Sequence, residues 1–187
     1  RGAGFRMSIG PDYTILALDL ATQTGWAQSR LDGAGLVSGS VRLRGKEPEE
    51  KGAHLQMIIM DHFKVMPFHH LIYEGAVPTS HLRGKTNVDT TYTAYGFPIA
   101  VGSSAINMGF PISRVLRVKV NDWRRHFIGT TSAGDRKETK RAVIARCRQL
   151  GWNPADDNEA DALGILDYQR ALLSPRYSAS SGPLFTA

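Results

Sequence analysis

Runs of apolar residues, broken by polar turns, divide the first part of the chain into strands. Residues 13–20 are almost wholly apolar as far as Asp19, which is typical of a buried β-strand. Extended patterns follow at residues 26–30 and 35–43, and an Asp-Gly turn signal lies between them. Because short turns join these segments, the sequence predicts three consecutive antiparallel strands.

Helical patterns then alternate with two further strands. Residues 47–50 read Glu-Pro-Glu-Glu, and a proline and acids in the first turn are start signals for a helix. Apolar residues recur on one helical face as far as Phe63. We expect a fourth strand at 71–74, a mostly helical segment between 87 and 108, and a fifth strand at 112–120.

The last part of the chain has the pattern of three helices. Asn121 is expected to cap a short helix, and Asp135 with Glu138 three residues later resembles a capping box for the next one. The final helix is predicted from 156 to 173. The resulting order predicts an α/β fold, in which a mixed five-stranded sheet is flanked by helices.

A chain of 187 residues is long enough for one domain with a substantial core. We expect this domain at 13–173, with 1–12 either disordered or derived from an expression vector and 174–187 as a mobile tail. Cys147 is the only cysteine, which excludes an intrachain disulfide and favours a reducing compartment. A cytoplasmic location is therefore expected. No apolar run approaches the ~18 residues that span a bilayer, so no membrane-spanning helix is expected.

The overall charge favours a polyanionic partner. The formal net charge is +6 and the isoelectric point is about 9.7. Basic charge of this size fits nucleic acid, although many basic proteins bind none. Charge alone therefore does not identify the partner. The positions of the acidic residues give more information.

Three carboxylates stand in separate segments at positions where a lone acid is costly. Asp19 ends the first strand, Glu74 ends the fourth, and Asp161 lies in the final helix. A carboxylate that closes a buried strand is unfavourable unless it is paired or binds a metal. Each residue alone has an ordinary explanation as a turn or cap residue. Together they predict an acidic cluster in the crevice at the strand ends, where Mg²⁺ would find oxygen ligands.

A fourth side chain can join the cluster from the same helix. Asp157 and Asn158 precede Asp161 by four and three residues, so either one shares its helical face. Two metals ~4 Å apart are able to clamp a phosphodiester, with one activating water and the other stabilising the departing 3′ oxygen. No nucleophilic side chain is needed for this chemistry. An acidic site in a basic chain is the pattern of a metal-dependent nuclease.

Three motifs resemble those of one known family. Residues 15–27, Ile-Leu-Ala-Leu-Asp-Leu-Ala-Thr-Gln-Thr-Gly-Trp-Ala, look like the first motif of RuvC-type Holliday junction resolvases. Residues 71–75, Leu-Ile-Tyr-Glu-Gly, look like the second acidic motif, and 158–163, Asn-Glu-Ala-Asp-Ala-Leu, like the closing one. The match spans about residues 13–168, in order and at family-like spacing. Phage- and prophage-encoded members are the nearest comparison.

The resemblance implies an RNase H-like fold, a homodimer, and Mg²⁺- or Mn²⁺-dependent cleavage of branched DNA such as the four-way junction. It also implies the cytoplasm of a bacterial or phage-infected cell. By position, Asp19, Glu74 and Asp161 would be the catalytic metal ligands. The fourth family position falls on Asn158, where many members have Asp and some His. An amide oxygen ligates a metal but takes up no proton, so Asp157 is an alternative source of the missing charge.

Basic residues near these motifs are candidates for DNA contacts. The loop after the fourth strand is basic and contains glycine, and in the family this region contacts the junction. A loop of this kind is also often a solvated surface, as is a basic helix face. The candidate DNA-binding residues are Arg83, Lys85 and Asn87 in this loop, Lys137 and Lys140 at the start of the penultimate helix, and Arg124.

Other functions remain compatible with parts of the pattern. An RNase H-like nuclease with the same metals could act on forks, flaps or RNA–DNA hybrids instead of junctions. A non-catalytic branched-DNA-binding module is a further alternative, although binding alone gains nothing from carboxylates that face phosphate. The residues after Asp19 faintly resemble the phosphate loop of actin-like kinases, but the chain is too short for two such lobes.

Overall fold

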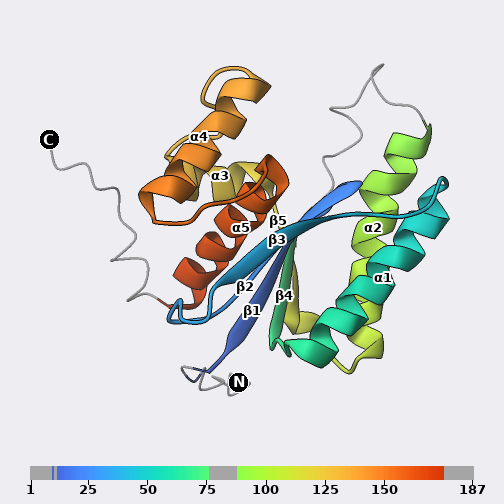
Figure 1. The fold of residues 1–187 in the computed structure, drawn as a ribbon. Coiled ribbons are helices and arrows are strands. Elements are labelled where there is room, and N and C mark those ends of the chain that lie inside the picture. Colours follow the sequence, from blue (N-terminus) through green and yellow to red (C-terminus); the bar gives the residue numbers. More distant parts are fainter. Residues whose placement is uncertain (1–9, 11, 76–87, 175–187) are drawn as a thin grey trace, which may run out of the picture.

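Three consecutive strands form one side of a five-stranded sheet. The computed structural model describes residues 10, 12–75 and 88–174 (Figure 1). Strands β1 (Thr14–Asp19), β2 (Gln23–Arg30) and β3 (Val37–Arg42) pair in antiparallel fashion. β2 starts three residues earlier than predicted, because Gln23 and Thr24 already pair with β3. The predicted antiparallel trio is confirmed.

Two parallel strands complete the sheet on the other side of β1. β4 (His70–Glu74) runs parallel to β1, and β5 (Val115–Val118) runs parallel to β4, so the strand order is β3-β2-β1-β4-β5. This is the mixed sheet that the sequence predicts. β1 lies at its centre, and the carboxyl ends of β1 and β4 are neighbours.

Helices cover both faces of the sheet (Figure 1). The helices α1 (Pro48–Val65) and α2 (Val88–Asn107) lie on one face. On the other face lie α3 (Val120–Ile128), α4 (Arg136–Gln149) and α5 (Asp157–Leu173). The predicted capping box at the start of α4 is confirmed. Within the described residues, no helix is both long and apolar enough to cross a membrane.

The alternation of side chains along β1 separates two apolar cores. Ile15 and Ala17 face the core formed with α3, α4 and α5, whereas Leu16 and Leu18 face the core formed with α1 and α2. α5 is buried over most of its length. A Cβ atom on Gly25 would clash with the backbone carbonyl of Asn158, so glycine lets the start of α5 lie directly against β2.

The segment around β5 differs from the prediction. The expected strand at 112–120 is a short 3₁₀ helix, η2 (Ile112–Arg114), followed by four residues of β5 that pair with β4 until that strand ends. Asn121 is not a helix cap; α3 is capped at Lys119 and has already begun at Val120. The earlier start buries Trp123 and Phe127 in the core. This burial outweighs the local capping preference of asparagine.

Candidate active site

The structure brings the three predicted carboxylates to one end of the sheet. Leu18 pairs with Tyr73 in the parallel ladder, so Asp19 and Glu74 follow side by side at the carboxyl ends of β1 and β4. Asp161 reaches the same place from the second turn of α5, which packs on β1 and β2. The charges of Asp161 and Glu74 both act on Asp19, which places the three side chains in one electrostatic cluster.

Burial and mutual repulsion disfavour the ionised form of these acids. Burial, together with the charges of Asp161 and Glu74, raises the pKa of Asp19 well above its usual value. Burial raises the pKa of Asp161 to about 6, against the opposing charge of Arg124. Burial also raises the pKa of Glu74, although a hydrogen bond from Trp123 lowers it. Such a cluster is stabilised by a cation.

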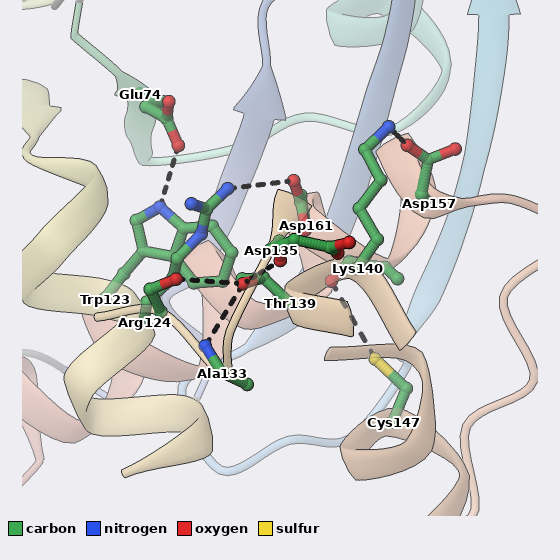
Figure 2. Close-up of polar contacts among 12 residues, drawn as sticks. Glu74, Trp123, Arg124, Ala133, Asp135, Thr139, Lys140, Cys147, Asp157 and Asp161 are labelled. Atoms are coloured by element: carbon green, nitrogen blue, oxygen red, sulfur yellow. Dashed lines mark hydrogen bonds and ion pairs between the residues drawn. The ribbon is translucent and has the colours of Figure 1, made fainter. Parts of the chain in front are cut away.

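Trp123 orients Glu74. Its indole Nε1–H donates a hydrogen bond of 2.8 Å to Oε2 of Glu74, and its ring is fully buried in α3 (Figure 2). The ring packs so closely on Gly164 of α5 that a Cβ atom there would lie 2.8 Å from it. The donor is therefore fixed by α5 and holds Glu74 at the end of β4.

Arg124 provides positive charge inside the cluster. Its guanidinium lies 5.2 Å from the centroid of the Trp123 ring, and Nη2 is 3.8 Å from Oδ2 of Asp161 (Figure 2). The positive charge lowers the pKa of Asp19, Glu74 and Asp161 alike. The sequence predicts Arg124 as a DNA contact, but here its nearest charged partner is Asp161.

The carboxylates fit a hard divalent cation as a donor set. Asp161 is only 8% exposed, and its Oδ1 is buried without a hydrogen-bond partner. A buried, unpaired carboxylate oxygen is costly unless it serves as a ligand. Among the described residues, no three His, Cys, Asp or Glu side chains lie close enough to share one ion. In this arrangement Oε2 of Glu74 is bonded to Trp123, and Oδ2 of Asp161 faces Arg124.

The two candidates for the fourth ligand lie at the start of α5. Asp156 caps this helix by accepting a 2.8 Å hydrogen bond from the backbone N–H of Glu159. Asp157 is half-buried and accepts a hydrogen bond from Lys140 of α4 (Figure 2). Asn158 is half-buried, with its backbone against Gly25. Asn158 and Asp157 thus stay alternatives, and Lys140 is occupied by an acid.

The predicted DNA contacts fall into three groups. Lys137 is exposed on the first turn of α4. Lys140 and Arg124 are half-buried and paired with acids. The remaining candidates, Arg83, Lys85 and Asn87, lie outside the described residues.

Sequence reasoning missed the role of Trp123. Trp123 and Phe127, four residues apart, identify an apolar helical face, so packing is the natural interpretation of the tryptophan. Packing is confirmed, but the indole also reaches Glu74, 49 residues away in the chain. No local signal in the sequence indicates this contact.

Comparisons with known proteins gave matches in structure but none in sequence. No protein-family model and no curated protein matches the chain. Thermus thermophilus RuvC superposes with a TM-score of 0.62 at 15% identity, covering 86% of this chain and 95% of RuvC. T. thermophilus RuvC in complex with Holliday junction substrate gives 0.60 at 15% identity, covering 91% and 96%. The yeast mitochondrial Holliday junction resolvase Ydc2 gives 0.56 at 10% identity, covering 94% and 82%.

These matches establish the fold. The order and directions of the strands are those of an RNase H-like sheet, and the neighbours are RuvC and the yeast mitochondrial Holliday junction resolvase Ydc2. The RuvC-like fold expected from the three motifs is therefore confirmed. At 10–15% identity the likeness concerns the fold alone.

Proposed function

We propose that this protein is a metal-dependent, structure-selective DNA endonuclease that resolves four-way junctions by paired nicks. The observation that carries the proposal is the convergence of Asp19, Glu74 and Asp161 at one end of the sheet, with a buried and unpaired oxygen on Asp161. One structural neighbour is a RuvC in complex with Holliday junction substrate, which supports a branched DNA as the substrate class.

The carboxylates of Asp19, Glu74 and Asp161 would hold Mg²⁺, or Mn²⁺ in its place, with Asn158 or Asp157 as the fourth ligand. Bound divalent cations lower the pKa of an attacking water and stabilise the departing 3′ oxygen. Trp123 keeps the Glu74 side chain at the mouth of the site through its indole N–H. The amide of Asn158 offers an oxygen but takes up no proton, so this position takes no part in acid–base chemistry.

The basic half of α4 is suited to position the DNA backbone beside the acids. Lys140 and Arg136 both lower the pKa of Asp161, so their charges lie near the cluster. Arg136 and Lys137 are exposed on the first turn of α4. Lysine and arginine at a surface bind phosphates through charge, with little dependence on base sequence. An enzyme that selects junctions recognises the shape of the DNA, so it needs contacts to the phosphate backbone rather than to base edges.

A homodimer would supply two active sites for the two strands of a two-fold symmetric junction. The outer surface of α1 and α2 carries exposed apolar side chains, and a groove of about 430 Å³ runs between the two helices. We assign this surface to the contact with a second copy of the chain. The exposed side chains include Met57 and Met60 of α1 and Tyr92, Tyr95, Ile99 and Ile106 of α2.

The first test is cleavage of a labelled, immobile four-way junction by the wild type and by Asp161→Asn in Mg²⁺, Mn²⁺ or EDTA. We expect symmetric paired nicks that require both the metal and Asp161. Asp32→Asn, which removes an exposed carboxylate from the turn between β2 and β3, is the matched control and should cleave normally. A fork and an RNA–DNA hybrid are run in parallel. Preferred cleavage of either one contradicts the junction as substrate, and binding without any cleavage contradicts the enzyme.

A further inference from the structure

Trp123 and Arg124, adjacent in α3, engage two of the three carboxylates. The indole of Trp123 donates to Glu74, while the guanidinium of Arg124 faces Asp161 across 3.8 Å (Figure 2). Arg124 also lies over the ring of Trp123, which is itself fully buried. The buried ring of Trp123 therefore supports the guanidinium of Arg124 beside the cluster.

The charge of Arg124 reaches every member of the cluster. It stabilises the ionised forms of Asp19, Glu74 and Asp161. Lys140 acts on Asp19 and Asp161, but its ammonium group is already bonded to Asp157. Arg136 acts on Asp161 from the exposed first turn of α4, and Arg125, the next residue along α3, is exposed. Among the cations of the described residues that act on the cluster, Arg124 is therefore the one that forms an ion pair with a carboxylate of the cluster.

The contact between Arg124 and Asp161 leaves both side chains incompletely bonded. Nε of Arg124 and Oδ1 of Asp161 are buried without hydrogen-bond partners. Their 3.8 Å separation exceeds the roughly 2.7–2.9 Å of a charge-assisted hydrogen bond. A buried pair built for stability would satisfy these atoms, because each unpaired polar group costs free energy. The geometry instead suits a weak ion pair, in which Asp161 can exchange Arg124 for another cation.

We propose that Arg124 is the resident counter-ion of the acidic cluster and competes with a divalent cation for Asp161. Without metal, the guanidinium offsets the repulsion among the carboxylates. A bound cation would take Asp161 as a ligand in place of its contact with Arg124 and would offset the same repulsion. This inference rests on the proposed metal site, and it makes Arg124 a positioning residue rather than a catalytic one.

The experiment measures thermal unfolding of the full chain against Mn²⁺ concentration, without DNA, for wild type, Arg124→Gln, Arg124→Lys and Arg125→Gln. Arg125→Gln removes the same charge from the exposed neighbouring position and is the matched control. Arg124→Gln should unfold at a lower temperature in EDTA and reach half-saturation at roughly threefold to tenfold less Mn²⁺. Arg124→Lys should restore most of the EDTA stability, and Arg125→Gln should match the wild type.

A double-mutant cycle with Asp161→Asn, carried out in EDTA, tests the pair without any metal. Replacing Arg124 should cost much less stability when Asp161 is already neutral, because the interaction is then absent. Additive effects in this cycle overturn the counter-ion role. An unchanged or higher half-saturating Mn²⁺ concentration in Arg124→Gln, or an equal decrease in Arg125→Gln, overturns the competition. A wild type that Mn²⁺ does not stabilise overturns the metal site itself, and the competition with it.

Discussion

Asp19 and Glu74 end two parallel strands that lie side by side at the centre of the sheet. The register pairs Leu18 with Tyr73, so each acid follows the last buried residue of its strand. The repulsion between these carboxylates is the direct consequence of this register, because a shift by one residue would turn one side chain to the other face. The sheet therefore builds the acidic site, and α5 adds Asp161.

Asp19→Asn should abolish cleavage while preserving junction binding. The change keeps the shape of the side chain but removes one ligand charge, so the cleavage rate should fall more than about 100-fold. The measurement is single-turnover cleavage in Mg²⁺ together with an electrophoretic binding assay in EDTA. Cleavage at the wild-type rate contradicts the assignment of Asp19 as a metal ligand.

The same variant should be more stable than the wild type in EDTA. The pKa of Asp19 is raised in the folded protein, so its ionisation costs stability as the pH rises through that pKa. An asparagine does not ionise and avoids this cost, so the unfolding free energy at neutral pH should be higher than that of the wild type. Urea unfolding checks the sign. A loss of stability shows that the charge of Asp19 is compensated without metal.

The location of the acidic cluster follows from local patterns in the sequence. Two apolar runs that end in acids predict strands, and the predicted order makes Asp19 and Glu74 neighbours. The position of Asp161 follows from helical periodicity. These patterns work because strand burial and helix amphipathicity are encoded within a few residues.

The contacts that hold the carboxylates are not local. Trp123 reaches Glu74 and Arg124 reaches Asp161 only because α3 packs against α5 in one orientation. The same docking explains the wrong prediction of Asn121 as a helix cap. Burial of Trp123 in the core decides where α3 begins, and a capping preference of about 1 kcal/mol does not.

The stability of the protein should fall as the pH drops from 6.5 toward 4 because of His70. Burial, and to a lesser extent the charge of Arg114, lower the pKa of His70 to about 4. The unfolded chain therefore binds a proton in this range that the folded protein does not, and about 3 kcal/mol of stability is lost. His70 contacts Tyr13 and Gln169 through its two ring nitrogens.

The check is urea unfolding at several pH values for the wild type and for His70→Gln. Glutamine does not titrate, so the difference in unfolding free energy between the two proteins isolates the histidine from the carboxylates. The wild type should lose its advantage over the variant as the medium becomes acidic. A difference that stays constant between pH 7 and pH 4 excludes a neutral, buried His70.

Ile99→Glu should convert a dimer into a monomer. Ile99 is 62% exposed on α2, beside the groove that we assign to a second copy of the chain. Burying a glutamate in an apolar contact leaves its charge unpaired, which costs several kcal/mol. Light scattering after size exclusion should report twice the 20.5 kDa chain mass for the wild type and one chain mass for the variant.

Leu172→Glu is the control for that experiment. Leu172 is 60% exposed on α5, on the opposite face of the sheet, so the same change there should leave the dimer intact. Dissociation by both variants points to a general effect of charge. A monomeric wild type contradicts the assigned surface.

Gly25→Ala should weaken both the fold and cleavage by displacing α5. A methyl group at Gly25 clashes with the backbone carbonyl of Asn158, and backbone atoms cannot move aside as a flexible side chain does. The start of α5 must shift away from β2, which should cost about 3 kcal/mol and move Asp161 relative to Asp19. Gly102→Ala in α2 is the matched control, since a Cβ atom there meets only the hydroxyl of Tyr73 at 3.4 Å and a methyl group of Val115 at 3.9 Å, which is ordinary van der Waals contact. In a helix interior this exchange should add roughly 0.5–1 kcal/mol of stability and leave cleavage unchanged. Equal stability and activity in both variants is incompatible with a site that depends on contact between β2 and α5.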